Sequence, residues 1–218
     1  MMKTTKRVWI RSCFLVMTSV VALFCCVVLA AAKVERTSAP PPEVSDALRS
    51  AVNDKGYRVT LDDGWTAEFW FVRQLKLEKK EAPGSLYPEL ADGEFIGVVK
   101  FTQAFSDYRG QSVAAGTYTL RYQLLPQDGN HMGVAPNPDF LLLIPASADA
   151  RPEQAYVFRK LVTLSAKSTG GEHPAVVAME SAGKAGTVVT NDKGEVVFSA
   201  DLGSKETLAI VIKGTAAQ

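Results

Sequence analysis

The strongest constraint on the fold is an alternation of apolar and polar side chains in residues 116–124. Every second side chain from Tyr118 to Leu124 is apolar, and the side chains between them are polar. Successive side chains of an extended chain point to opposite faces, so this period of two predicts a β-strand with one buried face. Residues 140–144, beyond a polar loop, are continuously apolar and predict a strand covered on both sides.

Similar short segments recur along the chain and are separated by turn-forming residues. The sequences DDG at 62–64 and NDKG at 191–194 are typical of hairpin turns. A helical period appears at 43–53 and at 152–165, where the proline suits a first turn. The sequence therefore predicts a mainly β domain, a single β-sandwich of Ig-like or transthyretin-like type with one or two short helices. The expected strands are 57–61, 65–72, 74–78, 94–101, 116–124, 140–144, 175–179, 187–190, 195–200 and 208–213.

Residues 1–32 have the three parts of a secretory signal peptide. Residues 1–12 are basic, residues 13–32 are almost wholly apolar, and the segment ends in three alanines. We expect cleavage after Ala32, which makes the protein periplasmic or secreted. The alternative is an uncleaved anchor, because about 20 apolar residues can span a bilayer, and the domain would then still lie outside the cytoplasm. Residues 33–43 are expected to form a Pro-rich linker and residues 44–218 the β-domain.

Charge and cysteine content exclude several classes of function. Four of the 24 basic residues lie in the leader, which leaves 20 bases against 23 acids in the remainder. A weakly acidic domain without a basic run is a poor candidate for nucleic-acid binding, because neutralising phosphates needs clustered Lys and Arg. All three cysteines lie in the leader, so the domain has no disulfide and no thiol nucleophile. The chain also lacks a nucleophile elbow, a phosphate-binding loop and a dinucleotide fingerprint.

The two histidines suggest a metal site. His131 lies in a polar loop with Asp128 and Asn130, and His173 lies in a second Gly-rich loop. If the two loops meet, His131, His173 and Asp128 would supply the three protein ligands of a zinc site with an open position. The opposing interpretation is that each histidine is a solvated loop residue, because no H-x-H or H-x-x-x-H spacing is present. The alternative carboxylate ligands are Asp139 and Glu172.

Two further groups are candidates for ligand binding. Asp107, Tyr108 and Arg109 combine a carboxylate, a hydroxyl and a guanidinium that together suit a polar ligand, although such a run more often orders a turn. Trp70 falls on the opposite face from Phe69 and its neighbours. On an exposed sheet face, the indole ring would stack on a sugar, although most aromatic side chains of this segment are expected to fill the core.

The segment 106–122, SDYRGQSVAAGTYTLRY, resembles part of certain uncharacterised exported bacterial proteins that contain a β-sandwich. The resemblance implies a β-sandwich with no established activity, so it assigns no catalytic residue or cofactor. The matching residues are Gly110, Ala115, Gly116, Tyr118 and Leu120.

These observations favour a non-enzymatic binding or structural module in the periplasm or at the cell surface. Its ligand or protein partner is not identified, and no cofactor is expected. One alternative is a metal-binding protein or metal-dependent hydrolase that uses His131 and His173. A carbohydrate-binding module is the other. We expect no nucleic-acid partner, and we expect membrane contact only through an uncleaved leader.

Overall fold

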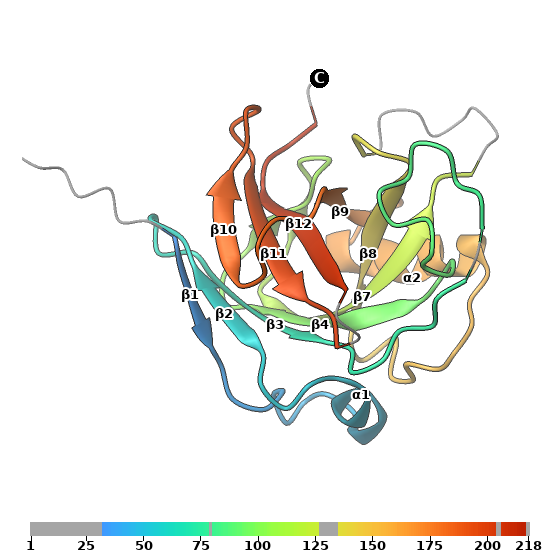
Figure 1. The fold of residues 1–218 in the computed structure, drawn as a ribbon. Coiled ribbons are helices and arrows are strands. Elements are labelled where there is room, and N and C mark those ends of the chain that lie inside the picture. Colours follow the sequence, from blue (N-terminus) through green and yellow to red (C-terminus); the bar gives the residue numbers. More distant parts are fainter. Residues whose placement is uncertain (1–31, 79, 127–134, 204–205, 217–218) are drawn as a thin grey trace, which may run out of the picture.

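A computed structural model describes residues 32–78, 80–126, 135–203 and 206–216, and Figure 1 shows its elements. Apart from Ala32, the predicted leader lies outside these residues. The helices are α1 (Asp46–Ala51) and α2 (Phe158–Thr169). The strands are β1 (Lys33–Arg36), β2 (Tyr57–Thr60), β3 (Thr66–Phe71), β4 (Phe95–Phe101), β5 (Phe105–Ser106), β6 (Ser112–Val113), β7 (Gly116–Leu124), β8 (Asp139–Pro145), β9 (Ala175–Glu180), β10 (Thr187–Thr190), β11 (Val196–Asp201) and β12 (Thr207–Lys213).

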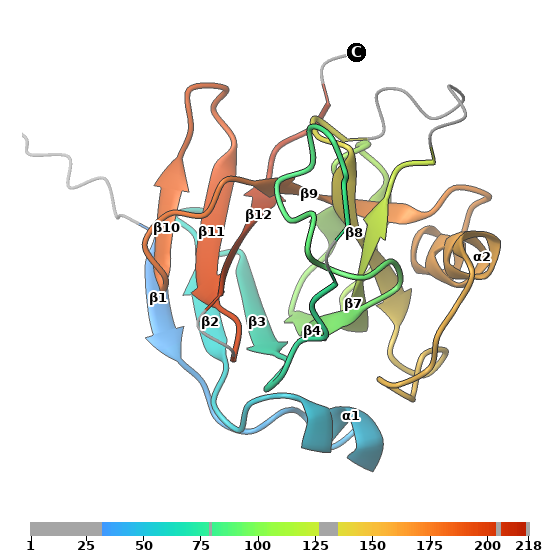
Figure 2. The ribbon, with the colours of Figure 1, turned by 45° about the vertical axis from the view of Figure 1, so that its right-hand side comes forward.

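Ten strands form one antiparallel sheet in the order β1-β2-β3-β4-β7-β8-β9-β12-β11-β10, and β5 and β6 form a separate pair. The large sheet curves until its edge strands β1 and β10 come close to each other (Figures 1 and 2), without a ladder between them in the described chain. The structure is therefore mainly β, as predicted, but it is a nearly closed barrel and not the expected two-sheet sandwich. The pairing of β9 with β12 makes the difference, because it joins strands that two separate sheets would divide.

The inside of the barrel is filled with side chains. The predicted apolar face of β7 points inward, and Tyr118, Leu120 and Tyr122 are buried there. Aromatic rings of β3 and β11 meet across the interior, and the rings of Phe69 and Phe198 lie 5.2 Å apart. Side chains thus fill the interior as a hydrophobic core.

The two helices cover parts of the outer surface of the sheet. Leu161 and Leu164 of α2 pack with Leu142 and Val176, on β8 and β9. Leu48 of α1 packs in another cluster with outer side chains of β3 and β4. Several central strands are consequently buried on both faces, including β7, which the sequence predicted to be half-buried. No helix in the described ranges is long and apolar enough to cross a membrane.

Besides shifts of one to three residues at the ends of other elements, three segments differ from the sequence predictions. Helix α2 begins at Phe158 and not at Pro152, because the preceding segment is held as a loop by a buried arginine. Residues 74–78 do not form a strand; they lie in the connection between β3 and β4. Residues 33–36, which were expected to begin the linker, pair with β2 as the edge strand β1.

Candidate functional site

Asp107 lies in the turn between β5 and β6, where its carboxylate organises the backbone. The side chain is fully buried. One carboxylate oxygen accepts hydrogen bonds from the backbone N–H groups of Arg109 and Gln111 at 3.0 and 2.7 Å. The other accepts from the Gln111 amide at 2.9 Å and from the Val176 N–H of β9 at 3.0 Å. These four bonds match the usual acceptor capacity of a carboxylate, so Asp107 fastens the turn to the sheet.

Tyr108 is buried next to Asp107, but its hydroxyl points elsewhere. It donates a hydrogen bond of 2.9 Å to the carboxylate of Glu195, which also accepts one from the Asn191 amide at 2.7 Å. Burial raises the pKa of Tyr108 to about 12, and the hydrogen bond to the Glu195 carboxylate adds to the shift. The Arg109 side chain is exposed. Asp107 therefore orders the turn, as the commoner interpretation of this run expects, and ligand binding by Tyr108 and Arg109 stays a prediction.

The proposed metal ligands are only partly described. Asp128, Asn130 and His131 fall in residues 127–134, outside the described residues, and His173 is exposed just before β9. Within the described chain, no group of three or more His, Asp or Glu side chains could hold a metal ion. The use of His131 and His173 in one site stays a prediction.

The strand topology attaches the loops of His131 and His173 to opposite ends of the barrel. The loop that contains His131 leaves the end of β7 and enters the start of β8, whereas His173 precedes the start of β9. Because β8 and β9 are antiparallel, the start of β9 lies beside the end of β8. Strand β8 has seven residues and is therefore about 23 Å long. The two loops are consequently attached at opposite ends of β8 and its neighbours.

Asp139, an alternative metal ligand, instead anchors a loop that closes one end of the barrel. Its carboxylate accepts hydrogen bonds from the Ser85 hydroxyl at 2.9 Å and from the backbone N–H groups of Leu86 and Tyr87 at 3.0 and 2.8 Å. The Tyr87 hydroxyl then donates to the Glu180 carbonyl at 2.8 Å. Burial raises the pKa of Tyr87 to about 12. These bonds place Tyr87 in the interior core, where it helps to fill the barrel.

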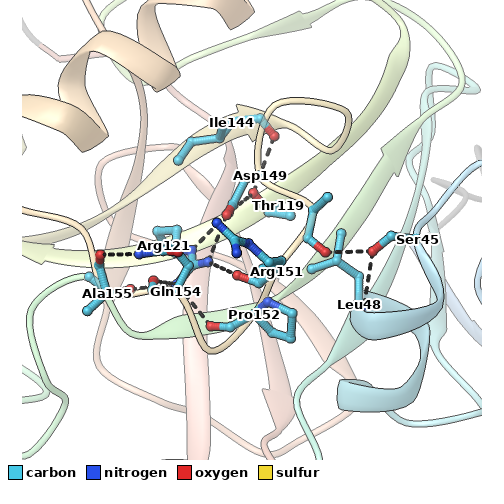
Figure 3. Close-up of polar contacts among 12 residues, drawn as sticks. Ser45, Leu48, Thr119, Arg121, Ile144, Asp149, Arg151, Pro152, Gln154 and Ala155 are labelled. Atoms are coloured by element: carbon cyan, nitrogen blue, oxygen red, sulfur yellow. Dashed lines mark hydrogen bonds and ion pairs between the residues drawn. The ribbon is translucent and has the colours of Figure 1, made fainter.

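A buried ion pair on the outer face of β7 has the densest polar contacts (Figure 3). The Arg121 and Asp149 side chains are 1% and 0% exposed, and two N–H···O bonds of 2.8 Å join them. The Thr119 hydroxyl donates to the same carboxylate at 2.7 Å. The guanidinium also donates to four backbone carbonyls at 2.9–3.1 Å, those of Gly93, Arg151, Pro152 and Gln154. The pair therefore fixes the segment between β8 and α2.

Trp70 does not form an exposed platform for sugars. It does point away from the interior, as expected, but it is only 1% exposed. The indole N–H donates a hydrogen bond of 2.7 Å to the Ser38 carbonyl, and the ring packs in the cluster that contains Leu48. The segment before α1 thus covers the face on which a carbohydrate ring would stack.

Sequence analysis missed a polar cleft at one end of the barrel, where β1, β3 and β11 end and β2 begins. The cleft has a volume of about 550 Å³, and the rings of Tyr57 and Phe71 line it, within the size range of small-molecule sites. Two backbone segments beside the cleft pack tightly against each other. The Gly203 N–H donates to the Val72 carbonyl at 3.2 Å, and a Cβ atom at Gly203 would overlap the backbone of Arg73.

Charged side chains surround the cleft. Arg73 is paired with Asp54 at 2.5 Å. Arg36 lies with its guanidinium carbon 4.0 Å from the centroid of the Tyr57 ring. Lys55 and Asp201 also line the cleft, and within the described chain Arg36, Lys55 and Asp201 form no ion pair. The sequence carries little signal for this site, because KVER at 33–36 has one apolar residue among three charged ones and does not alternate.

No protein-family model matches the chain, and no curated protein or solved structure is significantly similar to it. The fold and the cleft define the chain as an antiparallel, nearly closed β-barrel protein with a filled interior. The polar cleft with unpaired charged side chains in the described chain lies at one end of that barrel.

Proposed function

We propose that this protein is a non-enzymatic binding module that acts outside the cytoplasm, and that the cleft at the end of β1 is its binding site. One observation carries the proposal: the cleft is lined by charged groups without ion-pair partners in the described chain, Arg36, Lys55 and Asp201, and Arg36 lies over the ring of Tyr57. The buried polar groups described above are, by contrast, engaged in holding loops to the sheet. Asp107, Asp139 and Asp149 each accept several hydrogen bonds from their own chain.

Binding without turnover can be tested by a stability screen of the purified protein with organic acids, amines and sugars. A ligand that binds only the folded state raises the melting temperature by mass action. We expect stabilising compounds to lose their effect in Arg36→Ala and to keep it in Arg109→Ala, a control that also removes an exposed arginine. Mass spectrometry after long incubation should recover the compounds unchanged. Conversion of a compound that is lost in His131→Ala would overturn the proposal in favour of a metal-dependent hydrolase.

Export is the second part of the proposal, and it is supported by the leader sequence at 1–32. Expression of the full chain in a Gram-negative host, followed by fractionation and intact-mass measurement, tests it. We expect a periplasmic product whose first residue is Lys33. An uncleaved chain in the membrane fraction with the domain outside would support the anchor alternative. Intact protein in the cytoplasm would contradict export.

A further inference from the structure

We propose that the cleft selects a small monocarboxylate and that Arg36 is the residue that binds the carboxylate. This assignment rests on the proposed function, since it names the chemical class of the ligand for the same cleft. The carboxylate belongs either to a free organic acid or to the C-terminus of a peptide, and both present the same planar group.

The first reason is that Arg36 stacks on an aromatic ring and has no paired carboxylate among the described residues. Its guanidinium lies over the ring of Tyr57, and Tyr57 itself is only 5% exposed, so the guanidinium rests on a fixed surface. In the described residues, no carboxylate is paired with it. Arginine presents a rigid fork of N–H donors that matches a carboxylate with two parallel hydrogen bonds. Stacking on Tyr57 restricts the side chain before binding, and this lowers the entropy lost when a ligand binds.

The balance of charge in the cleft is the second reason. Among the described residues that line the cleft, three basic side chains face two acidic ones, and the contact between Asp54 and Arg73 cancels one charge of each sign. Arg36 and Lys55 then remain against Asp201, an excess of one positive charge. A ligand with a single negative charge neutralises this excess, whereas a phosphate dianion would leave the cleft with a net negative charge.

The floor of the cleft is the third reason. The rings of Tyr57 and Phe71 form part of its lining, and Phe71 also stacks on Phe69 in the core, with centroids 6.0 Å apart. These rings are held in place, and only 5% of Tyr57 and 2% of Phe71 remain exposed beside the charged groups. The volume of about 550 Å³ leaves room for the organic body of a carboxylate above this rigid floor, which a small hydrated anion would not fill.

Titration of the purified exported protein by calorimetry tests the assignment. The probes are benzoate, a tripeptide ending in phenylalanine with a free C-terminus, the same peptide amidated, and inorganic phosphate. We expect benzoate or the free peptide to bind, and we expect the amidated peptide and phosphate to bind at least about tenfold more weakly, because a charged bidentate contact is lost or mismatched. Tighter binding of benzoate would indicate a free organic acid as the ligand, and tighter binding of the free peptide would indicate a peptide C-terminus.

Substitutions in the cleft distinguish bidentate hydrogen bonding by Arg36 from attraction by its positive charge alone. Arg36→Lys keeps the charge but lacks the fork, and we expect it to weaken binding by about tenfold or more. Asp201→Asn removes a repulsion and should tighten binding severalfold, while Arg109→Ala should change nothing. Equal affinity in wild type and Arg36→Lys, or tighter binding of phosphate than of either carboxylate, would overturn the assignment. If a neutral or cationic compound binds in an Arg36-dependent manner, the carboxylate class is wrong but the binding function stands.

Discussion

Replacing Asp149 by alanine tests the role given to the buried ion pair. The change leaves the Arg121 guanidinium buried beside the outer face of β7 without its carboxylate, and it also removes the acceptor of the Thr119 hydroxyl. Removing one partner of a buried pair costs about 3–5 kcal/mol, because the remaining charge stays desolvated. For a chain of this size, each kcal/mol lowers the melting temperature by about 2–4 °C. We therefore expect a loss of about 6–20 °C.

Thermal and urea unfolding, both followed by circular dichroism, measure the losses of melting temperature and of unfolding free energy. Asp46→Ala is the matched control. Asp46 pairs with Arg49 at 2.6 Å, but its side chain is 97% exposed, and such surface pairs contribute about 0.5 kcal/mol or less. Asp149→Asn keeps the shape and one acceptor, so it should fall between wild type and alanine and serves if the alanine variant does not fold. A loss below about 1 kcal/mol in Asp149→Ala would refute the argument that this pair holds the loop before α2.

Three further predictions follow from other contacts. Gly97→Ala should cost about 3 kcal/mol, because its Cβ atom would overlap the Trp70 carbonyl of β3, whereas Gly64→Ala, at φ 81° in open space, should cost about 1 kcal/mol; equal losses in urea unfolding would contradict this. Tyr87 and Tyr108 have pKa values raised to about 12, so the folded state retains their protons and stability should fall as pH rises from 10 towards 12. Ultraviolet titration should then show tyrosine ionisation coinciding with unfolding, and free ionisation near pH 10 in the folded state would contradict it. Elemental analysis should find well below one metal ion per chain, and a stoichiometric metal lost in His131→Ala would contradict that expectation.

Local features of the fold could be predicted from the sequence because they depend on neighbouring residues. The alternation in 116–124 gave the correct inward face of β7. The DDG and NDKG turns connect β2 to β3 and β10 to β11, and their glycines have φ angles of 81° and 79°. Side-chain period and turn chemistry need no knowledge of distant partners, and this is why these predictions are confirmed.

The remaining features depend on contacts between residues far apart in the chain. Barrel closure needs β9 to pair with β12, and no local pattern specifies that pairing. The start of α2 is shifted because Arg121, some thirty residues earlier, binds the carbonyls of 151–154. Trp70 is covered by the segment around Ser38. The cleft combines residues of β1, β2, β3 and β11 with residues of the loops beside them. Arg36 lies in residues 33–43, which the sequence predicts to be a linker.

The position of β12 has a consequence for how the chain is made. The strand nearest the C-terminus lies between β9 and β11 and joins the first seven strands of the sheet to the final hairpin. A ribosome-bound or partly translocated chain that lacks residues 207–213 can form two partial sheets but cannot connect them. Completion of the sheet must therefore wait until residues 207–213 are available, and pairings over long sequence separations are slow to form. A nascent chain without residues 207–213 would leave the edges of β9 and β11 unpaired, and unpaired strand edges favour aggregation.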